Sequence, residues 1–479
     1  MTTATSETTR PATSAVVMEK PLTGARTWRL PAIDGMRAMA CMMVYAIHTW
    51  EFSGKPALPV HLFWVTIDVA RFVESFPAGV DLFMVLSGFC LFWPMCKSEE
   101  ALQKWSWQEY VWRRAKRICP PYYVAIAYVI LFPQLLVVVS RMWGVQYGGH
   151  DPHFQPNPSA GNFIAHLLFV HTLSFSKWDG ITGAFWSLGL EMQFYVVFPL
   201  VVYQFRRHRV WTLVGMIAVS ILFRVLLNIV LIEHYQINET VIKPFGRSAA
   251  DELQDVARLC NISFLGRWMQ FAMGMGAAML VAKYYRNHKL LSAWAGTGLL
   301  ALTMALYAIV FSGAIDSLPW ELRTSPSGGA WMATLNWVIH ALAMGLRIFP
   351  TRDVLMGLLF SISLFAVSSS RSWARHVFEF KPIVFVGTIS YSIFLIHQTT
   401  AWFFSELVRK KLYRQYDLSG DGSVSHYLLM LTVGLAVVLM VSYPYYLLFE
   451  KPFIANSSAK ARNAAASAKP TVVSTPGNT

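Results

Sequence analysis

The sequence predicts an all-α integral membrane protein, a polytopic bundle of about 10–12 transmembrane helices. Hydrophobic residues make up 55% of the 479 residues and charged residues 14%, and the mean hydropathy is +0.43. The apolar residues gather in blocks of about twenty, the length that a helix needs to cross the hydrocarbon core. A soluble domain would distribute its apolar residues around one core instead.

The blocks suited to spanning follow one another along most of the chain. They lie at about 31–50, 78–95, 118–139, 184–205, 210–232, 263–282, 290–312, 330–347, 354–368, 382–405 and 427–449. Two shorter pieces, near 60–75 and 161–175, are expected to be interfacial or re-entrant. Basic segments at 371–381 and 409–414 cannot both be cytoplasmic if the block at 382–405 crosses once. One block is therefore misassigned, which leaves the number of spans open.

The chain divides into one transmembrane domain, residues 30–454, and two tails, 1–29 and 455–479. Both tails are polar and rich in small residues, a composition typical of disorder. The first tail lacks a short apolar core followed by a cleavage site, so we expect a retained cytoplasmic tail rather than a signal peptide. The expected location is the plasma (inner) membrane.

The formal net charge of +14 points to the membrane rather than to nucleic acid. A basic cluster falls between the second and third blocks and comprises Lys97, Lys104, Arg113, Arg114, Lys116 and Arg117. Clustered basic residues mark cytoplasmic loops, which explains most of the charge and leaves binding of a polyanionic ligand as the alternative. The five cysteines lack paired or metal-type spacing, so we expect buried thiols and no metal site.

Arg37 and His48 are the most informative pair in the first block. Eleven helical residues advance about 1,100°, within roughly 20° of three full turns, and rise about 16 Å. Both side chains therefore lie on one face with Asp34. A cation and an imidazole are costly in hydrocarbon, which predicts a partner, water or a substrate path. The alternative is a charged helix end that snorkels to the interface and one hydrogen-bonded histidine.

Seven segments in order resemble the motifs of the acyltransferase 3 family. They are Asp34-Gly35-Met36-Arg37 with His48, the segment 80–89 (VDLFMVLSGF), 113–120 (RRAKRICP), 186–195 (WSLGLEMQFY), 266–274 (GRWMQFAMG), 387–397 (GTISYSIFLIH) and 450–453 (EKPF). The resemblance implies a membrane O-acyltransferase without a permanently bound cofactor. Such an enzyme would move an acyl group, expected to be acetyl, from cytoplasmic acyl-CoA to a hydroxyl of a carbohydrate or glycosylated acceptor.

Three positions depart from the family pattern. Ala38 replaces the glycine usual after the first arginine, Met192 replaces one of two acids after Trp-Ser-Leu, and Lys451 replaces an arginine before the C-terminal proline. If the two acids act as a pair in the family, only Glu191 is left to act here.

The chemistry that the resemblance implies needs a base, an electrophilic group and a donor site. His48 fits the base, with direct attack or a covalent acyl intermediate both open, and Arg37 is better suited to positioning donor phosphate or carbonyl. Arg113, Arg114 and Arg117 would form a basic vestibule for the donor. Arg114 and Arg117 would share a helix face. We expect the prolines at 120–121 to end or redirect that helix.

Other buried polar residues have two interpretations each. Glu191, with Ser187 and Tyr195 on its face, either pairs structurally with an arginine (Arg37, Arg224 or Arg267) or belongs to the site. Arg267, a candidate for donor binding, has the same two interpretations.

His397 either lines the cavity or lies at a helix end in the interface. His166 and His171 are candidates for an entrance used by the acyl acceptor. The Ser87-Gly88 pair favours close packing or a kink beside the first helix over a catalytic serine.

Two other function classes stay open. Intramembrane Arg, His and Glu also suit a proton-coupled transporter or flippase, and the chain could be a membrane scaffold without catalysis. The enzyme hypothesis requires Arg37 and His48 to line one passage that a thioester can enter.

Overall fold

The computed structural model describes residues 30–62, 65–96, 98–142, 158–173, 177–238, 262–286, 291–311, 351–369, 373–409 and 423–454. Within these ranges the chain is helical apart from one short hairpin and connecting turns. Six helical segments are long and apolar enough to cross a membrane, and a bent helix pair makes a seventh if it counts as one span. The protein is therefore an integral multi-pass membrane protein, as the sequence predicts.

Most predicted blocks form helices. The helices that shape the bundle are α1 (Pro31–Phe52), α3 (Ala78–Phe92), α5 (Trp107–Met142), α7 (Trp186–Arg207), α8 (Arg209–Asn238), α10 (Phe264–Arg286), α11 (Ala293–Phe311), α14 (Thr351–Ser369), α16 (Lys381–Thr388), α17 (Ser390–Leu407) and α19 (Leu435–Tyr445). Shorter elements join them: η1 (Trp93–Cys96), α4 (Glu99–Gln103), α6 (Ala160–Leu167), η2 (His171–Leu173), η3 (Gly183–Phe185), α15 (Trp373–Phe378), α18 (Val424–Leu429), η7 (Met430–Gly434) and η8 (Tyr446–Glu450). The block at 330–347 and both tails lie outside the described residues.

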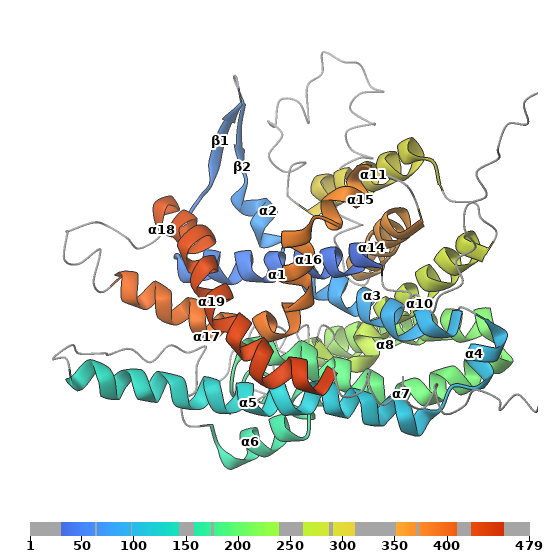
Figure 1. Cartoon of the computed structure of the whole chain (residues 1–479), viewed down its shortest axis with the longest axis horizontal. Helices are drawn as coiled ribbons and strands as arrows, with labels where there is room; N and C mark the ends of the chain where they lie inside the picture. Colours follow the sequence, from blue (N-terminus) through green and yellow to red (C-terminus); the bar gives the residue numbers. More distant parts are fainter. Residues whose placement is uncertain are drawn as a thin grey trace, which may run out of the picture.

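Helix α1 occupies the centre of the bundle, with α16 crossing it and α3 beside it (Figure 1). Pro31 begins α1 at a position where its missing N–H is not needed, and Asp34 in the first turn complements the helix dipole. Neither α1 nor α10 is among the six spanning segments, yet α10 packs against α3, α8 and α14 in the bundle.

The block at 382–405 is not one straight span. Helices α16 and α17 meet at an angle of 75° around Ile389. A Cβ at Gly387 would lie 1.7 Å from the Asp34 carbonyl oxygen, so glycine allows the backbones of α16 and α1 to touch. A bent pair of this kind is either a broken span or a re-entrant loop, so the block need not be the single straight crossing that the two basic segments exclude.

Of the two expectations for the prolines at 120–121, that they end or redirect a helix, the first is wrong. Helix α5 continues through both prolines, so the basic cluster at 113–117 lies in the same helix as the following apolar residues. Tyr391 donates a hydrogen bond to the Ile118 carbonyl at 3.0 Å, and Tyr445 donates to the Pro121 carbonyl. Tyrosines from α17 and α19 thus attach this proline-containing part of α5 to the bundle.

The two short pieces outside the predicted spans take different forms. Strands β1 (Pro59–Leu62) and β2 (Val65–Asp68) pair antiparallel, with Pro59 opposite Asp68, and α2 (Ala70–Glu74) follows. This hairpin projects from the bundle (Figure 1), and the expectation of an all-helical chain missed it. The piece near 161–175 contains α6 and η2, both too short to span a membrane.

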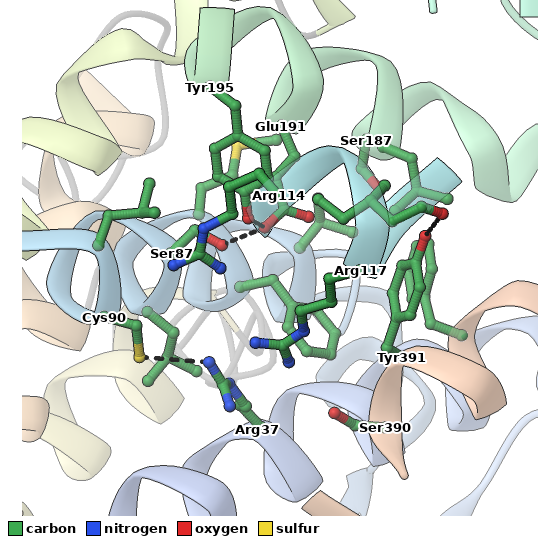
Figure 2. A pocket seen from close by; sticks show the side chains of 18 of the residues that line it. Arg37, Ser87, Cys90, Arg114, Arg117, Ser187, Glu191, Tyr195, Ser390 and Tyr391 are labelled. Atoms are coloured by element: carbon green, nitrogen blue, oxygen red, sulfur yellow. Dashed lines mark hydrogen bonds between the residues drawn. The ribbon is translucent and has the colours of Figure 1, made fainter. Parts of the chain in front are cut away.

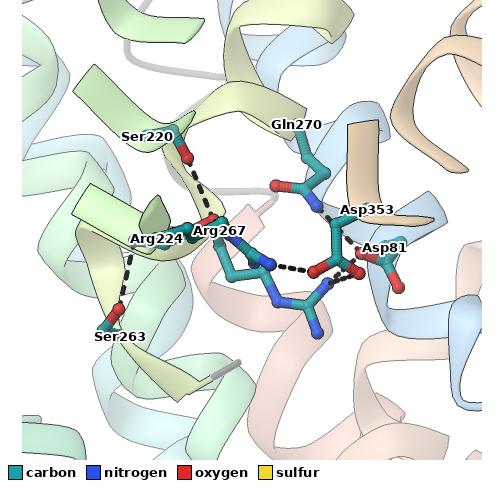
Figure 3. A network of polar contacts seen from close by, with 8 residues as sticks. Asp81, Ser220, Arg224, Ser263, Arg267, Gln270 and Asp353 are labelled. Carbon is teal, nitrogen blue, oxygen red and sulfur yellow. Dashed lines mark hydrogen bonds and ion pairs between the residues drawn. The ribbon is translucent and has the colours of Figure 1, made fainter. Parts of the chain in front are cut away.

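Four buried charges join α3, α8, α10 and α14 (Figure 3). Arg224 pairs with Asp353, and Arg267 pairs with Asp81 and lies 3.6 Å from Asp353. Gln270 adds a 3.0 Å hydrogen bond to Asp81. Removing one partner of a buried ion pair leaves a charge uncompensated, at about 3–5 kcal/mol. These pairs therefore fix the mutual positions of four helices.

Glycines bring α3 and α10 into backbone contact. A Cβ at Gly88 would lie 2.2 Å from the Phe271 carbonyl oxygen, and one at Gly274 would lie 2.0 Å from the Val85 carbonyl oxygen. The expected close packing at Ser87-Gly88 is confirmed, but Gly88 packs against α10 rather than α1. Small residues at helix crossings serve this purpose in membrane proteins.

Replacing Gly274 by alanine should destabilise the bundle. The added methyl meets backbone rather than a mobile side chain, so the helices must move apart at about 1–3 kcal/mol. The measurement is the midpoint of thermal unfolding in detergent, with Gly298→Ala on α11 as the matched control because no atom lies within 4 Å of that Cβ position. Equal midpoints for the two variants would contradict the proposed crossing.

Candidate active site

A cavity opens between α1, α3, α5 and α7 and is closed on one side by α16 and α17. It contains about 930 Å³ of space, counting its open mouth. Its lining residues include Arg37, Phe83, Ser87, Cys90, Arg114, Arg117, Ser187, Glu191, Tyr195, Tyr391 and Phe394. Phe271 also lines it, so six of the seven predicted family segments meet at one cavity.

Three guanidinium groups point into this cavity (Figure 2). Arg37 on α1 contacts Asp34 at 3.2 Å and donates to Cys90 Sγ at 3.3 Å. Arg114 and Arg117 come from adjacent turns of α5, as their spacing predicts. Arg114 lies over the Tyr195 ring, 5.4 Å from its centroid, a cation–π contact that holds the side chain in place.

Glu191 is the acidic residue among those lining the cavity. Its Oε1 accepts a 2.6 Å hydrogen bond from Ser87 Oγ and a second from the Tyr195 hydroxyl. Within the described part of the chain, no arginine lies within 4.0 Å of this carboxylate, so the expected structural ion pair does not form there. The lining holds three arginines and one carboxylate, with Asp34 beside Arg37 and the buried Glu450 near Arg117 behind it. The surface that a ligand meets is therefore predominantly positive, which favours an anionic ligand.

Two arginines predicted to bind the donor lie elsewhere. Arg113 is half-exposed on the outer side of α5 and pairs with Glu109 at 3.4 Å. Arg267 belongs to the buried network of Figure 3, although its guanidinium lies 5.9 Å from the Trp186 ring centroid, one residue before Ser187 of the cavity. The role of either residue in donor binding stays a prediction.

His48 does not line the cavity that Arg37 lines. Its Nδ1 lies 3.2 Å from Glu51 Oε2, and its ring centroid lies 5.4 Å from that of His397. Phe394 both lines the cavity and contacts the His397 ring at 5.7 Å. Phe83, also in the lining, packs edge-on against Phe394 at 5.7 Å. An aromatic pair therefore separates the arginines from the two histidines, and the single passage that the sequence hypothesis requires is closed here.

The other three candidate histidines, His166, His171 and His397, are buried. His397 lies within α17 at 1% exposure, so its expected place at a helix end in the interface is wrong. His166 and His171 stack at 4.0 Å, and neither lines the cavity. Burial lowers the pKa of His166 to about 4 and that of His171 to about 3, so both rings are neutral at pH 7.

Sequence reasoning missed Phe83, Phe394, Cys90 and Glu51 as neighbours of the site. Aromatic residues in an apolar block carry no signal that separates lipid-facing from cavity-facing positions. Glu51 had a signal, since it follows His48 by three residues on a helix and therefore lies on the same face.

Comparison with known proteins agrees with the family that the seven segments resemble. Residues 30–447 match the acyltransferase domain of the acyltransferase 3 family. A peptidoglycan O-acetyltransferase, OatA, of Listeria monocytogenes serovar 1/2a is 26% identical over 183 residues, which is 36% of this chain and 24% of the relative. An O-acetyltransferase, OatA, of Staphylococcus aureus strain NCTC 8325 is 24% identical over 251 residues, 51% of this chain and 36% of the relative.

The chain therefore matches about a third or less of the length of these two relatives. No solved structure gives a significant match. The domain match, in contrast, extends over most of this chain and includes α1, α3, α5, α7 and α17, which carry the cavity residues. The chain belongs to the acyltransferase 3 family.

Proposed function

We propose that this protein is a membrane O-acetyltransferase that takes its acetyl group from acyl-CoA and places it on a hydroxyl of a carbohydrate. One observation carries the proposal: Arg37, Arg114 and Arg117 converge on one cavity whose lining includes a single carboxylate, Glu191. Membership of an acyltransferase family gives the reaction class, and the names of the relatives give the acetyl group and, in one case, peptidoglycan as the acyl acceptor.

The donor fits the charge of the cavity. Acyl-CoA carries several phosphate charges, and guanidinium groups bind phosphate oxygens with two parallel charge-assisted hydrogen bonds. Two further basic residues lie at the same end of the bundle, beside α4. Arg206 at the end of α7 donates to the Leu102 carbonyl at 2.7 Å, and Arg209 pairs with Glu99 at 2.5 Å. By the positive-inside rule this end faces the cytoplasm, where acyl-CoA is available, and the N-terminus of α1 lies there too.

His48 supplies the base. The hydroxyl oxygen of the acyl acceptor attacks the thioester carbonyl carbon while its proton passes to His48 Nε2. Collapse of the tetrahedral intermediate breaks the carbon–sulfur bond, and the CoA thiolate leaves and takes up the proton. Arg37 stays charged at any working pH, so it holds the donor and does not transfer protons.

The acyl group must pass Phe83 and Phe394 to reach His48. The two rings pack edge to face at the inner end of the cavity. Rotation of these side chains opens a route along α1 from Arg37 to the histidine, about 16 Å away. Closing this route between turnovers keeps water from the thioester.

Turnover of labelled acetyl-CoA by the purified protein in proteoliposomes tests the proposal. We expect CoA release and transfer of label to a peptidoglycan fragment or another carbohydrate. Movement of a solute with the donor unchanged would support the transporter class instead.

Replacing Arg114 and Arg117 together by glutamine should raise the KM for acetyl-CoA. Each lost charge-assisted contact is worth about 1.5–3 kcal/mol, so the increase should be at least tenfold, with little change in kcat. Arg113→Gln tests whether the whole basic cluster or only the cavity-lining pair binds the donor. We expect its KM for acetyl-CoA to stay within twofold of the wild-type value. An unchanged KM in the double variant would remove donor binding from this cavity.

Cys90 gives a measurement of donor binding that does not depend on turnover. Its thiol lines the cavity beside Arg37. In a variant that keeps Cys90 and has the other four cysteines replaced, CoA should protect Cys90 from alkylation by a maleimide. Protection should weaken in the Arg114→Gln, Arg117→Gln variant.

His48→Ala should lower acetyl transfer by about 10²–10⁴-fold, the usual contribution of a general base. CoA protection of Cys90 should be unaffected, because His48 does not line the cavity. His376→Ala is the matched control, since this exposed histidine lies on α15. Transfer at the wild-type rate in His48→Ala would refute the proposed mechanism.

Phe83→Trp should slow transfer without weakening donor binding. The larger ring packs against Phe394 and narrows the route to His48, so kcat should fall several-fold at an unchanged KM for acetyl-CoA. A wild-type kcat with an intact fold would show that the acyl group does not pass between these rings.

A further inference from the structure

Glu51 contacts His48 in the last turn of α1. Glu51 Oε2 lies 3.2 Å from His48 Nδ1, and the other carboxylate oxygen lies 3.9 Å from Lys55 Nζ. The side chains of His48 and Glu51 are 21% and 36% exposed, so the pair is partly shielded from solvent. Neither the family segments nor the proposed reaction assigns Glu51 a role.

We propose that Glu51 is a positioning residue, which holds His48 in the tautomer that carries its proton on Nδ1 and leaves Nε2 free to act as the base. The inference rests on the proposed function, in which Nε2 receives the proton of the acceptor hydroxyl. Glu51 itself touches neither substrate nor the reacting atoms.

The chemistry of the contact selects the tautomer. A neutral imidazole has one N–H, and an ionised carboxylate can only accept hydrogen bonds. With the proton on Nδ1, His48 donates to Glu51 in a charge-assisted bond. With the proton on Nε2, the Nδ1 lone pair faces the carboxylate and the contact is repulsive. The carboxylate therefore favours the tautomer whose Nε2 is an acceptor.

His397 does not favour the opposite tautomer of His48. Its Nδ1 lies 2.9 Å from the Phe394 carbonyl oxygen and 3.2 Å from the Ile393 carbonyl oxygen, so Nδ1 carries its proton. His397 Nε2 is then an acceptor, and within the described chain this buried nitrogen has no hydrogen-bond partner. A neutral His397 cannot donate to His48 Nε2.

Aromatic neighbours hold the plane of the His48 ring. The Phe52 ring stacks on it at 6.4 Å with an interplanar angle of 22°, and the His397 ring lies 5.4 Å away. Glu51 and two rings together fix the imidazole. A base is effective only when its lone pair is held in the productive direction, and a partner of this kind typically contributes 10–100-fold.

Glu51→Gln tests the role of the carboxylate. The glutamine amide has nearly the same shape but can turn its NH₂ group towards Nδ1, which stabilises the wrong tautomer. We expect kcat to fall by about 10–100-fold with an unchanged KM for acetyl-CoA. Glu51→Asp keeps a carboxylate and should retain more activity than Glu51→Gln. CoA protection of Cys90 should be normal in both variants, which verifies the fold.

Lys55→Ala is the matched control, because Lys55 is the other charged neighbour of Glu51. The kcat of Lys55→Ala should stay within twofold of the wild-type value. A Glu51→Gln variant with a kcat within twofold of wild type, or a Lys55→Ala variant with the same loss as Glu51→Gln, overturns the inference.

The outcome for His48→Ala separates the two proposals. If His48→Ala is inactive while Glu51→Gln is fully active, His48 remains the base and only the role of Glu51 fails. If His48→Ala transfers acetyl normally, the proposed function of His48 fails, whatever Glu51→Gln does.

Discussion

The cost of placing a charge inside an apolar bundle governs this structure. Arg224 and Arg267 meet that cost with carboxylates from other helices, Asp353 and Asp81, and so tie α3, α8, α10 and α14 together. The arginines of the cavity have weaker compensation: one contacts a carboxylate three residues away, and another lies over an aromatic ring. Because buried cations seek anions, the first group is structural and the second is suited to a ligand that brings its own negative charge.

The positions of the helices could be predicted from sequence because hydrophobic length is a local property. The blocks at 78–95, 184–205 and 354–368 correspond closely to helices α3, α7 and α14. Departures occur where a tertiary contact overrides the local signal. Gly387 beside the α16–α17 break touches the backbone of α1, and tyrosines from other segments donate to carbonyls of α5 near its prolines. Neither contact can be inferred from the residues on one side alone.

The candidate site was only partly predictable for the same reason. Helical spacing placed Arg114 and Arg117 on one face, and the structure puts both in the cavity. Spacing also placed Arg37 and His48 on one face of α1, but a shared face does not guarantee a shared cavity. The Phe83–Phe394 contact joins helices more than 300 residues apart in sequence and interrupts the path between the two. Composition cannot reveal such a barrier, because phenylalanine is common throughout the apolar blocks.

The separation between Arg37 and His48 suits an acyl-CoA donor better than a small acyl phosphate. The phosphates of CoA cannot follow the acyl group into the apolar interior without losing hydration. Under the proposed function, the donor therefore keeps its charges near the three arginines while its reactive carbonyl reaches the histidine about 16 Å along α1. A long, flexible and uncharged arm between the phosphates and the thioester meets that requirement, and it can slide between two aromatic rings that would exclude an anion. The proposed function thus places donor binding at the basic end of the bundle and proton transfer at the end of α1 where Glu51 lies beside His48.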